Sequence, residues 1–366
     1  MNDEVEIRTE RPAWMLATPA RRDELQQPNG LRALLVRLMR GQHLDRKQAG
    51  ELLGAMLDGK ATDAQIAAAL VALAVKGETI EELAGMAGAM RQRGTRITSK
   101  YKTVLDTAGT GSSAVKTFNV STAAAFVIAA AGVPVAKHGS RAATSKSGSA
   151  DVLAQLGVNV NTAPQTSADC LNELGICFMF APLYHAATAR VASVRRELGV
   201  HTTFNLLGPL TNPARASRQI IGVWHAALVE PLARTLGLLG CERAWVVHGS
   251  DGLDEVTLAG STYVAETSNG KVRTFDFTPH EFGLKPASLA NIRDNDAEKS
   301  AAIIRDVLTG KRTDATRDLV IINAAAGLVV GGAASDFRDA ADIAQRVIDS
   351  GAAQAKLRAL VDATNR

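Results

Sequence analysis

The stretch that decides the fold is TVLDTAGTGSSAVKTFNVSTAAAFVIAAAGVPVAK, residues 103–137. It contains two short apolar runs, 103–106 and 133–137, on either side of an Ala-rich segment at 121–131. We expect the runs to form strands and the Ala-rich segment to form the helix between them. Further apolar runs follow at 176–181, 219–224 and 243–249. They alternate with helical segments, so the sequence predicts an α/β fold with a mostly parallel central sheet covered by helices.

A helical region precedes this unit. Asp45 is a predicted N-cap, and TDAQ at 62–65 and TIEE at 79–82 are typical of capping boxes. No strand pattern interrupts the region, so we expect a small helical domain. The expected division of the chain is a flexible extension at 1–30, a helical domain at 31–98 joined by helices within 164–200, and an α/β domain at 99–163 and 201–366.

The composition is that of an ordinary globular protein. Of 366 residues, 46% are hydrophobic and 21% are charged, which excludes a disordered chain. The longest apolar runs are interrupted by Gly, Pro or Asn, and the first residues contain no apolar signal segment, so we expect no membrane segment. The 41 Lys and Arg against 37 Asp and Glu give a net charge of +4, which does not by itself indicate nucleic-acid binding.

The cysteines indicate the compartment. Cys170, Cys177 and Cys241 occur without a Cys-x-x-Cys pair. This pattern excludes a disulfide scaffold or a zinc knuckle and fits a reducing environment, so we expect a cytoplasmic protein.

Two segments around the Ala-rich helix are candidates for phosphate binding. The first, DTAGTGSS at 106–113, contains glycines that let the backbone approach an anion, although a plain tight turn is an equally good interpretation of this segment alone. The second, TFNVST at 117–122, places four small polar side chains beside the free amides of a helix start. Because N-capping needs only one such residue, we favour a phosphate or metal–phosphate cradle.

A third candidate, KHGSRAATSKSGSAD at 137–151, begins where a predicted strand ends. Open α/β sheets bind ligands in the loops that follow their strands. Lys137 and Arg141 can neutralise phosphate charge, and Ser145 and Ser149 can donate hydrogen bonds. A solvated basic loop is the alternative interpretation.

Two further segments carry charged side chains of interest. Asp254 and Glu255, in the Gly-containing turn HGSDGLDE at 248–255, are possible oxygen ligands for Mg²⁺, although an exposed acidic turn is the better interpretation of this segment alone. Arg195, on a predicted helix, could bind a carboxylate in bidentate fashion. Residues 204–210 are apolar enough to be core, and we assign them no chemistry.

Six motifs, in this order and spacing, resemble those of the anthranilate phosphoribosyltransferase family. They are AGTG at 108–111, TFNVSTAAAF at 117–126, VAKHGSR at 135–141, SKSGSADVL at 145–153, FNLLGPLTNP at 204–213 and HGSDGLDE at 248–255. The resemblance extends from about Leu31 to the C-terminus. It implies a small helical domain hinged to a larger α/β domain of the nucleoside phosphorylase/phosphoribosyltransferase type, and a homodimer that forms through the helical domain.

The resemblance also implies the activity. Enzymes of this family transfer the phosphoribosyl group of phosphoribosyl pyrophosphate to the amine of anthranilate and release pyrophosphate, in the second step of tryptophan synthesis. Mg²⁺ is the implied cofactor. Because the anthranilate amine is already neutral, no catalytic acid or base is expected, and the rate would come from positioning and electrostatic stabilisation.

The implied roles of individual residues follow from their motif positions. The donor would bind to Gly109, Thr110, Gly111, Ser112, Ser113, Thr117, Asn119, Val120, Ser121, Thr122, Lys137, His138, Gly139, Ser140, Arg141, Ser145 and Ser149. The acceptor would bind to Gly109, His138, Ser140, Tyr184, His185 and Arg195. The metal would bind to Ser121, Asp254 and Glu255.

Three departures from the family pattern keep two alternatives open. Ser112 and Ser113 replace a glycine and a carboxylate, Ser140 replaces an asparagine, and Ala186 replaces a proline. The first alternative is a phosphoribosyltransferase of the same fold with a different aromatic acceptor. The second, suggested also by the pI of about 9.0, is a non-catalytic paralogue that binds nucleic acid through its basic surface. Retention of the predicted donor and metal residues argues against the second.

Overall fold

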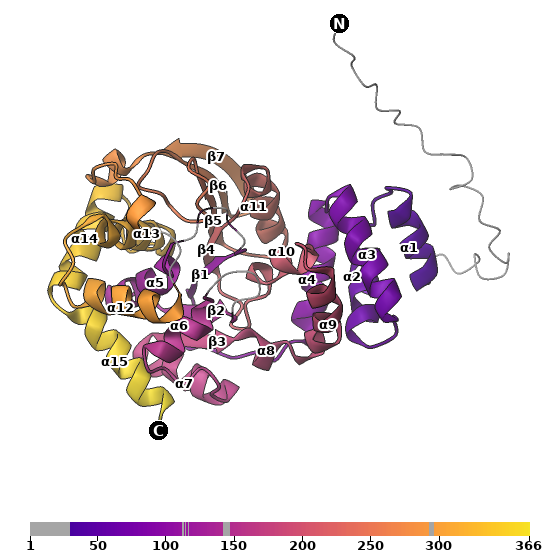
Figure 1. Cartoon of the computed structure of the whole chain (residues 1–366), viewed down its shortest axis with the longest axis horizontal. Helices are drawn as coiled ribbons and strands as arrows, with labels where there is room; N and C mark the ends of the chain where they lie inside the picture. Colours follow the sequence, from indigo (N-terminus) through magenta and orange to yellow (C-terminus); the bar gives the residue numbers. More distant parts are fainter. Residues whose placement is uncertain (1–29, 112, 114, 116, 142–146, 293–295) are drawn as a thin grey trace, which may run out of the picture.

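The computed structural model describes residues 30–111, 113, 115, 117–141, 147–292 and 296–366. The extension predicted at 1–30 lies outside these residues, apart from Gly30. A helical bundle packs beside an α/β domain that is built around one seven-stranded sheet (Figure 1). This arrangement confirms the predicted fold class. In the described part of the chain, no helix is both long enough and apolar enough to cross a membrane.

Capped helices form the bundle, as the sequence predicts. They are α1 (Leu31–Met39), α2 (Arg46–Leu57), α3 (Asp63–Lys76) and α4 (Ile80–Arg93). Asp45, Thr62 and Thr79 each accept a hydrogen bond from the backbone amide three residues on, and each is part of a capping box, which confirms the predicted caps. Glu82 also accepts a hydrogen bond from the Leu44 amide at 2.9 Å.

The sheet has the order β3-β2-β1-β4-β5-β6-β7. The strands are β1 (Leu105–Gly109), β2 (Val135–Gly139), β3 (Ile176–Phe180), β4 (Arg218–Gly222), β5 (Arg243–Gly249), β6 (Thr262–Ser268) and β7 (Lys271–Phe277). The first five in this order are parallel, which confirms the mostly parallel sheet. Strands β1 and β2 each begin two residues later than predicted and continue into the following glycine.

The hairpin of β6 and β7 is absent from the sequence prediction. The two strands pair antiparallel along their whole length, and β6 pairs antiparallel with β5. Asn269 and Gly270 connect them with φ angles of 49° and 77°. Two successive positive φ angles at an Asn-Gly pair are typical of the type I′ turn, which was the available sequence signal.

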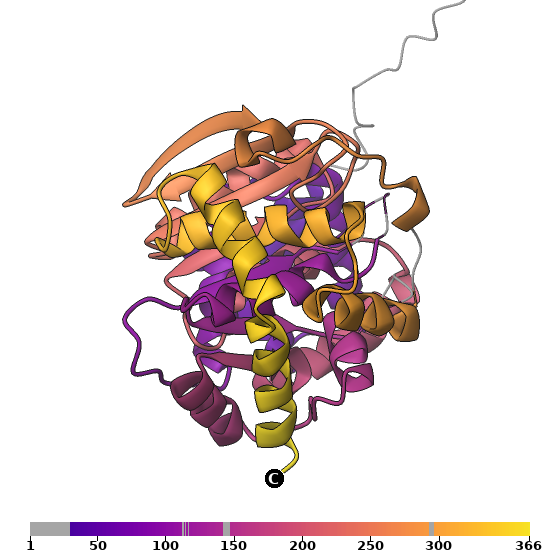
Figure 2. The ribbon, with the colours of Figure 1, turned by 90° about the vertical axis from the view of Figure 1, so that its left-hand side faces the viewer.

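Helices cover both faces of the sheet. They are α5 (Val120–Ala130), α6 (Ser149–Gln155), α7 (Pro164–Leu174), α8 (Ala181–Tyr184), α9 (Ala189–Leu198), α10 (Thr203–Leu207), α11 (Val229–Leu238), α12 (Ala297–Leu308), α13 (Ala315–Gly331), α14 (Phe337–Asp349) and α15 (Ala352–Thr364). Helices α5 and α13 pack on one face, and α11 packs on the other, where it also contacts α4 of the bundle. The C-terminal helices form the layer farthest from the bundle (Figures 1 and 2).

Helix α9 and the side chain of Arg91 are among the contacts that join the bundle to the α/β domain. Helix α9 packs against α2 and α3, whereas α7 packs against β3 and α15. The guanidinium group of Arg91, on α4, donates to the carbonyl oxygens of Leu210 at 2.8 Å and Leu239 at 3.1 Å. Burial lowers the pKa of Arg91 to about 10. One half-buried cation therefore ties the bundle to two segments of the α/β domain.

The close packing of α2 on α4 generates a prediction about two glycines of α4. A Cβ on Gly85 would overlap the carbonyl oxygen of Arg46, whereas a Cβ on Gly88 would meet nothing within 4 Å. We expect Gly85→Ala to destabilise the protein by about 1–3 kcal/mol through overpacking. Gly88→Ala should stabilise it by roughly 0.5–1 kcal/mol, because alanine is the better helix former. Thermal unfolding followed by circular dichroism measures both shifts, and shifts of the same sign would contradict the packing described.

Candidate active site

A cleft of about 510 Å³ lies at the carboxyl ends of the parallel strands. It is lined by the segments that follow β1, β2 and β5, by the start of α5, and by parts of α9 and α10. The strand order reverses between β1 and β4, which is where open α/β sheets bind their ligands. Met90, on α4, extends the lining to the helical bundle.

Most of the predicted site residues line this cleft. They are Gly109, Thr110, Gly111, Thr117, Asn119, Ser121, Lys137, His138, Gly139, Ser140, Arg141, Ser149, His185, Arg195, Asp254 and Glu255. Segments up to about 145 residues apart in the sequence are therefore brought to one site. The predicted Ser112 and Ser145 lie outside the described residues.

Four predicted residues do not line the cleft. Ser113 is buried, and its hydroxyl donates to the carbonyl oxygens of Gly252 at 2.7 Å and Val115, so it ties the glycine loop to the acidic turn. Val120 and Thr122 belong to the first turn of α5, and their side chains are buried. Tyr184 is buried in the core of the α/β domain. These four side chains point away from the cleft because they pack against segments that are distant in the sequence.

The segment 204–210 contributes to the cleft, contrary to the expectation that it is core alone. Phe204, Asn205, Gly208 and Pro209 line it, while the leucines of the segment are buried. The guanidinium carbon of Arg195 lies 5.0 Å from the centre of the Phe204 ring. Burial lowers the pKa of Arg195. An amide, a glycine and a proline inside an apolar run were the signal for this role.

Lys137 provides the buried positive charge of the site. Its ammonium group donates to the carbonyl oxygen of Thr107 and lies 3.3 Å from the hydroxyl oxygens of Thr107 and Ser121. Burial lowers the pKa of Lys137, and the charges of Asp106 and Glu255 act in the opposite direction. The cation faces the start of α5, whose free amides favour anions.

Asp254 and Glu255 provide the negative charge. Burial and then the charge of Asp254 raise the pKa of Glu255 to about 8. A Glu255 carboxylate oxygen accepts a hydrogen bond from the Ser121 amide at 3.3 Å. A Cβ at position 222 would overlap the carbonyl oxygen of Asp254, so Gly222 is required for the turn to approach β4.

This donor set fits a magnesium ion. Two adjacent carboxylates and the Ser121 hydroxyl are oxygen ligands, the kind of ligand that Mg²⁺ prefers. Within the described residues, no group of three or more His, Cys, Asp or Glu side chains could hold a metal. Mg²⁺ commonly takes one or two carboxylates and completes its coordination with water and substrate phosphates.

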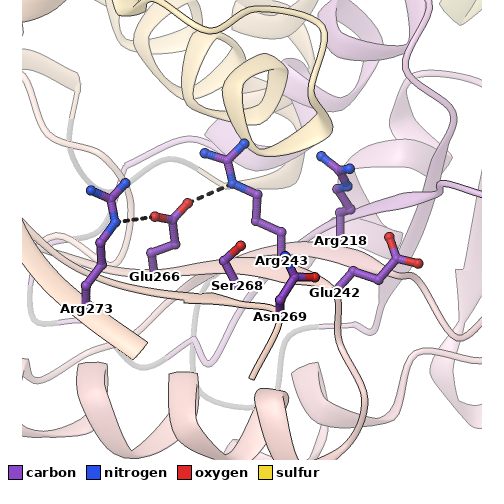
Figure 3. Close-up of a pocket in the computed structure, with 7 residues that line it drawn as sticks. All are labelled: Arg218, Glu242, Arg243, Glu266, Ser268, Asn269 and Arg273. Atoms are coloured by element: carbon purple, nitrogen blue, oxygen red, sulfur yellow. Dashed lines mark hydrogen bonds and ion pairs between the residues drawn. The ribbon is translucent and has the colours of Figure 1, made fainter. Parts of the chain in front are cut away.

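A second cavity, of about 460 Å³, lies at the amino ends of β4 and β5, away from the cleft. Figure 3 shows the residues that line it. Its arginines have protein partners. Arg243 and Arg273 donate to Glu266 at 2.7 and 2.6 Å. Arg218 and Arg243 each donate, at 2.8 Å, to one of the last carbonyl groups of α13. These guanidinium groups therefore cap a helix C-terminus, as cations commonly do.

Comparison with known proteins identifies the class first. Residues 32–94 match the helical bundle domain and residues 101–354 match the a/b domain of a glycosyl transferase family. Together with the cleft between a helix N-terminus, a buried lysine and paired carboxylates, this defines a glycosyl transferase.

The relatives then identify the family within that class. An anthranilate phosphoribosyltransferase of Moorella thermoacetica is 49% identical over 90% of this chain and 97% of its own length. The corresponding protein of Pelotomaculum thermopropionicum is 47% identical over 90% of this chain and 95% of its own length. The crystal structure of anthranilate phosphoribosyltransferase from Thermus thermophilus has a TM-score of 0.86, is 39% identical and covers 91% of this chain and 99% of its own. The chain belongs to the anthranilate phosphoribosyltransferase family.

The two histidines of the cleft generate a prediction about pH. The rings of His138 and His185 lie 5.2 Å apart, centre to centre. Burial, as the main cause, lowers the pKa of His138 to about 3 and that of His185 to about 4. We expect neither ring to titrate between pH 5 and 8. Because the unfolded rings bind protons below about pH 6.5, the free energy of unfolding should fall as the pH drops from there toward the folded pKa values.

Histidine ring resonances followed by NMR between pH 4.5 and 8 measure this directly. Assignment uses His138→Gln and His185→Gln. A midpoint near 6.5 for either ring would contradict the described burial.

Proposed function

We propose that this chain transfers the phosphoribosyl group of phosphoribosyl pyrophosphate to the amine of anthranilate and releases pyrophosphate. The observation that carries this proposal is the convergence, in one cleft, of an anion site, paired carboxylates and a half-buried arginine. The relatives support it by name. A Saccharomyces cerevisiae anthranilate phosphoribosyltransferase, 27% identical with a TM-score of 0.83, covers 92% of this chain and 98% of its own, and its structure contains PRPP and Mg.

The donor diphosphate would lie against the start of α5. Backbone amides at a helix N-terminus and in a glycine loop bind phosphate oxygens, and the dipole of the helix favours negative charge there. Gly109–Gly111 supplies such a loop, and Asn119–Ser121 supplies the helix start. The Lys137 ammonium adds a full positive charge beside Ser121. These predicted donor-binding residues would therefore all act in the same way, by binding the negative charge of the diphosphate.

Ser121, Asp254 and Glu255 would hold Mg²⁺ at the same end of the cleft. The chemistry supplied by bound Mg²⁺ is neutralisation of the charge on the diphosphate. In the protein, Glu255 is oriented by the Ser121 amide, and Asp254 is fixed by the close approach of its backbone to Gly222. The chain therefore presents its two carboxylates next to the helix that binds the diphosphate.

The acceptor would lie on the Arg195 side. A guanidinium group binds a carboxylate through two parallel hydrogen bonds, and the Phe204 ring beneath Arg195 restricts its position. The amine attacks the anomeric carbon as the bond to the diphosphate breaks, and the nitrogen then loses a proton. The attacking amine is neutral, so the site needs no strong base; the low pKa values of His138 and His185 accord with this. Rate would come from positioning and from charge stabilisation.

The division into domains is part of the proposal. We assign residues 31–98 and helix α9 to the helical domain, because α9 packs on α2 and α3. The rest of 164–200 goes with the α/β domain, since α7 packs on β3. Because the cleft is lined by Met90 as well as by the strand ends, movement of the bundle about the Arg91 contacts would close it and exclude water.

A homodimer through the helical domain and a cytoplasmic location complete the proposal. Met39, Val71 and Val75, on α1 and α3, are 65%, 43% and 81% exposed, and exposed apolar side chains of this kind favour association.

All three cysteines are free and buried, which fits a reducing compartment. The volume of the cleft, about 510 Å³, favours small substrates over nucleic acid.

The proposed metal role predicts the behaviour of a double variant. Asp254→Asn with Glu255→Gln should lower pyrophosphate release by about a hundredfold or more, because several kcal/mol of charge stabilisation is lost. The fold should remain, since both changes preserve shape. Asp251→Asn, in the same turn, is the matched control: asparagine can still accept the hydrogen bond from the Leu253 amide, so activity should change less than threefold. Near-normal turnover in the double variant would reject the assigned metal role.

Ser140 supports a second candidate, a transferase with a different aromatic acceptor. Ser140 lines the cleft at the position where the family pattern has an asparagine. We expect anthranilate to give the highest kcat/KM in a panel of substituted anthranilates and heterocyclic amines, with donor and magnesium saturating. A heterocyclic amine that is clearly better than anthranilate would favour the second candidate. Pyrophosphate release without any acceptor gives the background.

A further inference from the structure

The pairing of β1 with β2 stops almost as soon as it begins. Strand β1 pairs with β4 over five residues, and β2 pairs with β3 over five residues. Between β1 and β2, the register contains only Leu105 opposite Val135. The backbone ladder between β1 and β2 therefore ends after this pair, although the two strands stay side by side toward their carboxyl ends, where the cleft lies.

Beyond this pair, side chains form hydrogen bonds with the backbone groups that would otherwise pair β1 with β2. Continuation of the register would join the Thr107 amide to the Ala136 carbonyl and the His138 amide to the Thr107 carbonyl. Instead, the Ala136 carbonyl accepts from the Asn212 amide group at 2.9 Å. The His138 amide donates to an Asp106 carboxylate oxygen at 3.1 Å, and the Thr107 carbonyl accepts from Lys137.

Asp106 and Asn212 also bond to each other. The second carboxylate oxygen of Asp106 accepts from the Asn212 side chain at 2.7 Å. The side-chain oxygen (Oδ1) of Asn212 accepts from the Ala214 amide at 2.8 Å, so both the oxygen and the nitrogen of this side chain have partners. Both residues are buried to within 1% of full burial. A buried pair with satisfied partners has one geometry, because any other leaves polar groups unpaired.

The segment that carries Asn212 also contacts the bundle and the cleft. Gly208 and Pro209, just before it, line the cleft. Arg91 of α4 donates to the Leu210 carbonyl, and a ring nitrogen of His185 lies 3.1 Å from the Thr211 carbonyl oxygen. The pair therefore lies where this segment meets the ends of β1 and β2.

From these contacts we infer that Asp106 and Asn212 are positioning residues for the donor: they bridge the ends of β1 and β2 in place of the backbone ladder and thereby set the spacing between the 109–111 loop and the 138–141 loop. Both loops line the cleft. Neither Asp106 nor Asn212 lines it, so they act through the strands. This inference rests on the proposed function for its kinetic test, but not for its structural test.

The kinetic test varies the donor in the holoenzyme, with magnesium and anthranilate saturating. In Asp106→Asn, an amide N–H group would oppose the Asn212 N–H group, and the strand ends would shift. We expect the KM for phosphoribosyl pyrophosphate to rise at least about tenfold and the KM for anthranilate to change less than threefold. A donor KM within twofold of the wild-type value would overturn the inference.

Glu266→Gln is the matched control. Glu266 is also a buried carboxylate with several donors, among them Arg243, Arg273 and the Trp245 indole, but it lies at the other cavity. It should lower the thermal midpoint as Asp106→Asn does and leave the donor KM within twofold. An equal rise of the donor KM in both variants would show a general loss of stability and overturn the inference.

An exchanged pair supplies a rescue. In Asp106→Asn/Asn212→Asp, the new asparagine can accept from the His138 amide and donate to the new aspartate, whereas Asn212→Asp alone places two carboxylates together. Both variants lose the donor to the Ala136 carbonyl, so Asn212→Asp is the reference. We expect the double variant to recover part of the donor KM, or of folded protein, relative to Asn212→Asp. No recovery on either measure would contradict the pair.

Hydrogen–deuterium exchange gives the structural test without substrate. Peptides that cover 133–139 should exchange faster in Asp106→Asn than in the wild type, and unchanged in Glu266→Gln. If wild-type protein does not turn over anthranilate, the proposed function fails, and this exchange result still decides the inference. Unchanged exchange at 133–139 in folded Asp106→Asn would overturn it.

Discussion

The replacement of backbone ladder bonds between β1 and β2 by buried side chains is the constraint on which the site depends. A buried amide or carbonyl without a partner is costly, so Asp106, Asn212 and Lys137 each have a fixed place. Their side chains bridge β1 and β2 at the carboxyl ends of these strands, where the ladder bonds are missing. The same contacts bring the Lys137 ammonium beside the start of α5. The same hydrogen bonds therefore fix the ends of the two strands and the position of the positive charge in the cleft.

Electrostatics follows from this geometry. Lys137 is buried and Glu255 half-buried, both beside Ser121, and loss of solvent shifts the pKa of each toward its neutral form. Binding of a diphosphate favours the charged form of Lys137, and binding of a divalent cation favours the charged form of Glu255. A site of this kind is arranged to bind both together. Neither His138 nor His185 has to exchange a proton for the reaction to begin, which agrees with their low pKa values.

Local signals explain what the sequence predicts well. The caps at Asp45, Thr62 and Thr79 depend on neighbours three residues away, and β5 has the apolar run 244–247 at its centre. The type I′ turn at 269–270 was equally local and could have been used. Asp106 could not be assigned a role, because its partner Asn212 lies 106 residues away in the chain. Composition likewise cannot distinguish Phe204, which lines the cleft, from Tyr184, which is core.

The most direct measurement of the central claim is a crystal structure of the protein with phosphoribosyl pyrophosphate and Mg²⁺. We expect the diphosphate between the 109–111 loop and the start of α5, next to Lys137, with the metal at Asp254 and Glu255. The strand ends should keep the separation set by Asp106 and Asn212. Donor bound elsewhere, such as in the arginine-lined cavity, or a cleft left empty at saturating donor, would contradict the account.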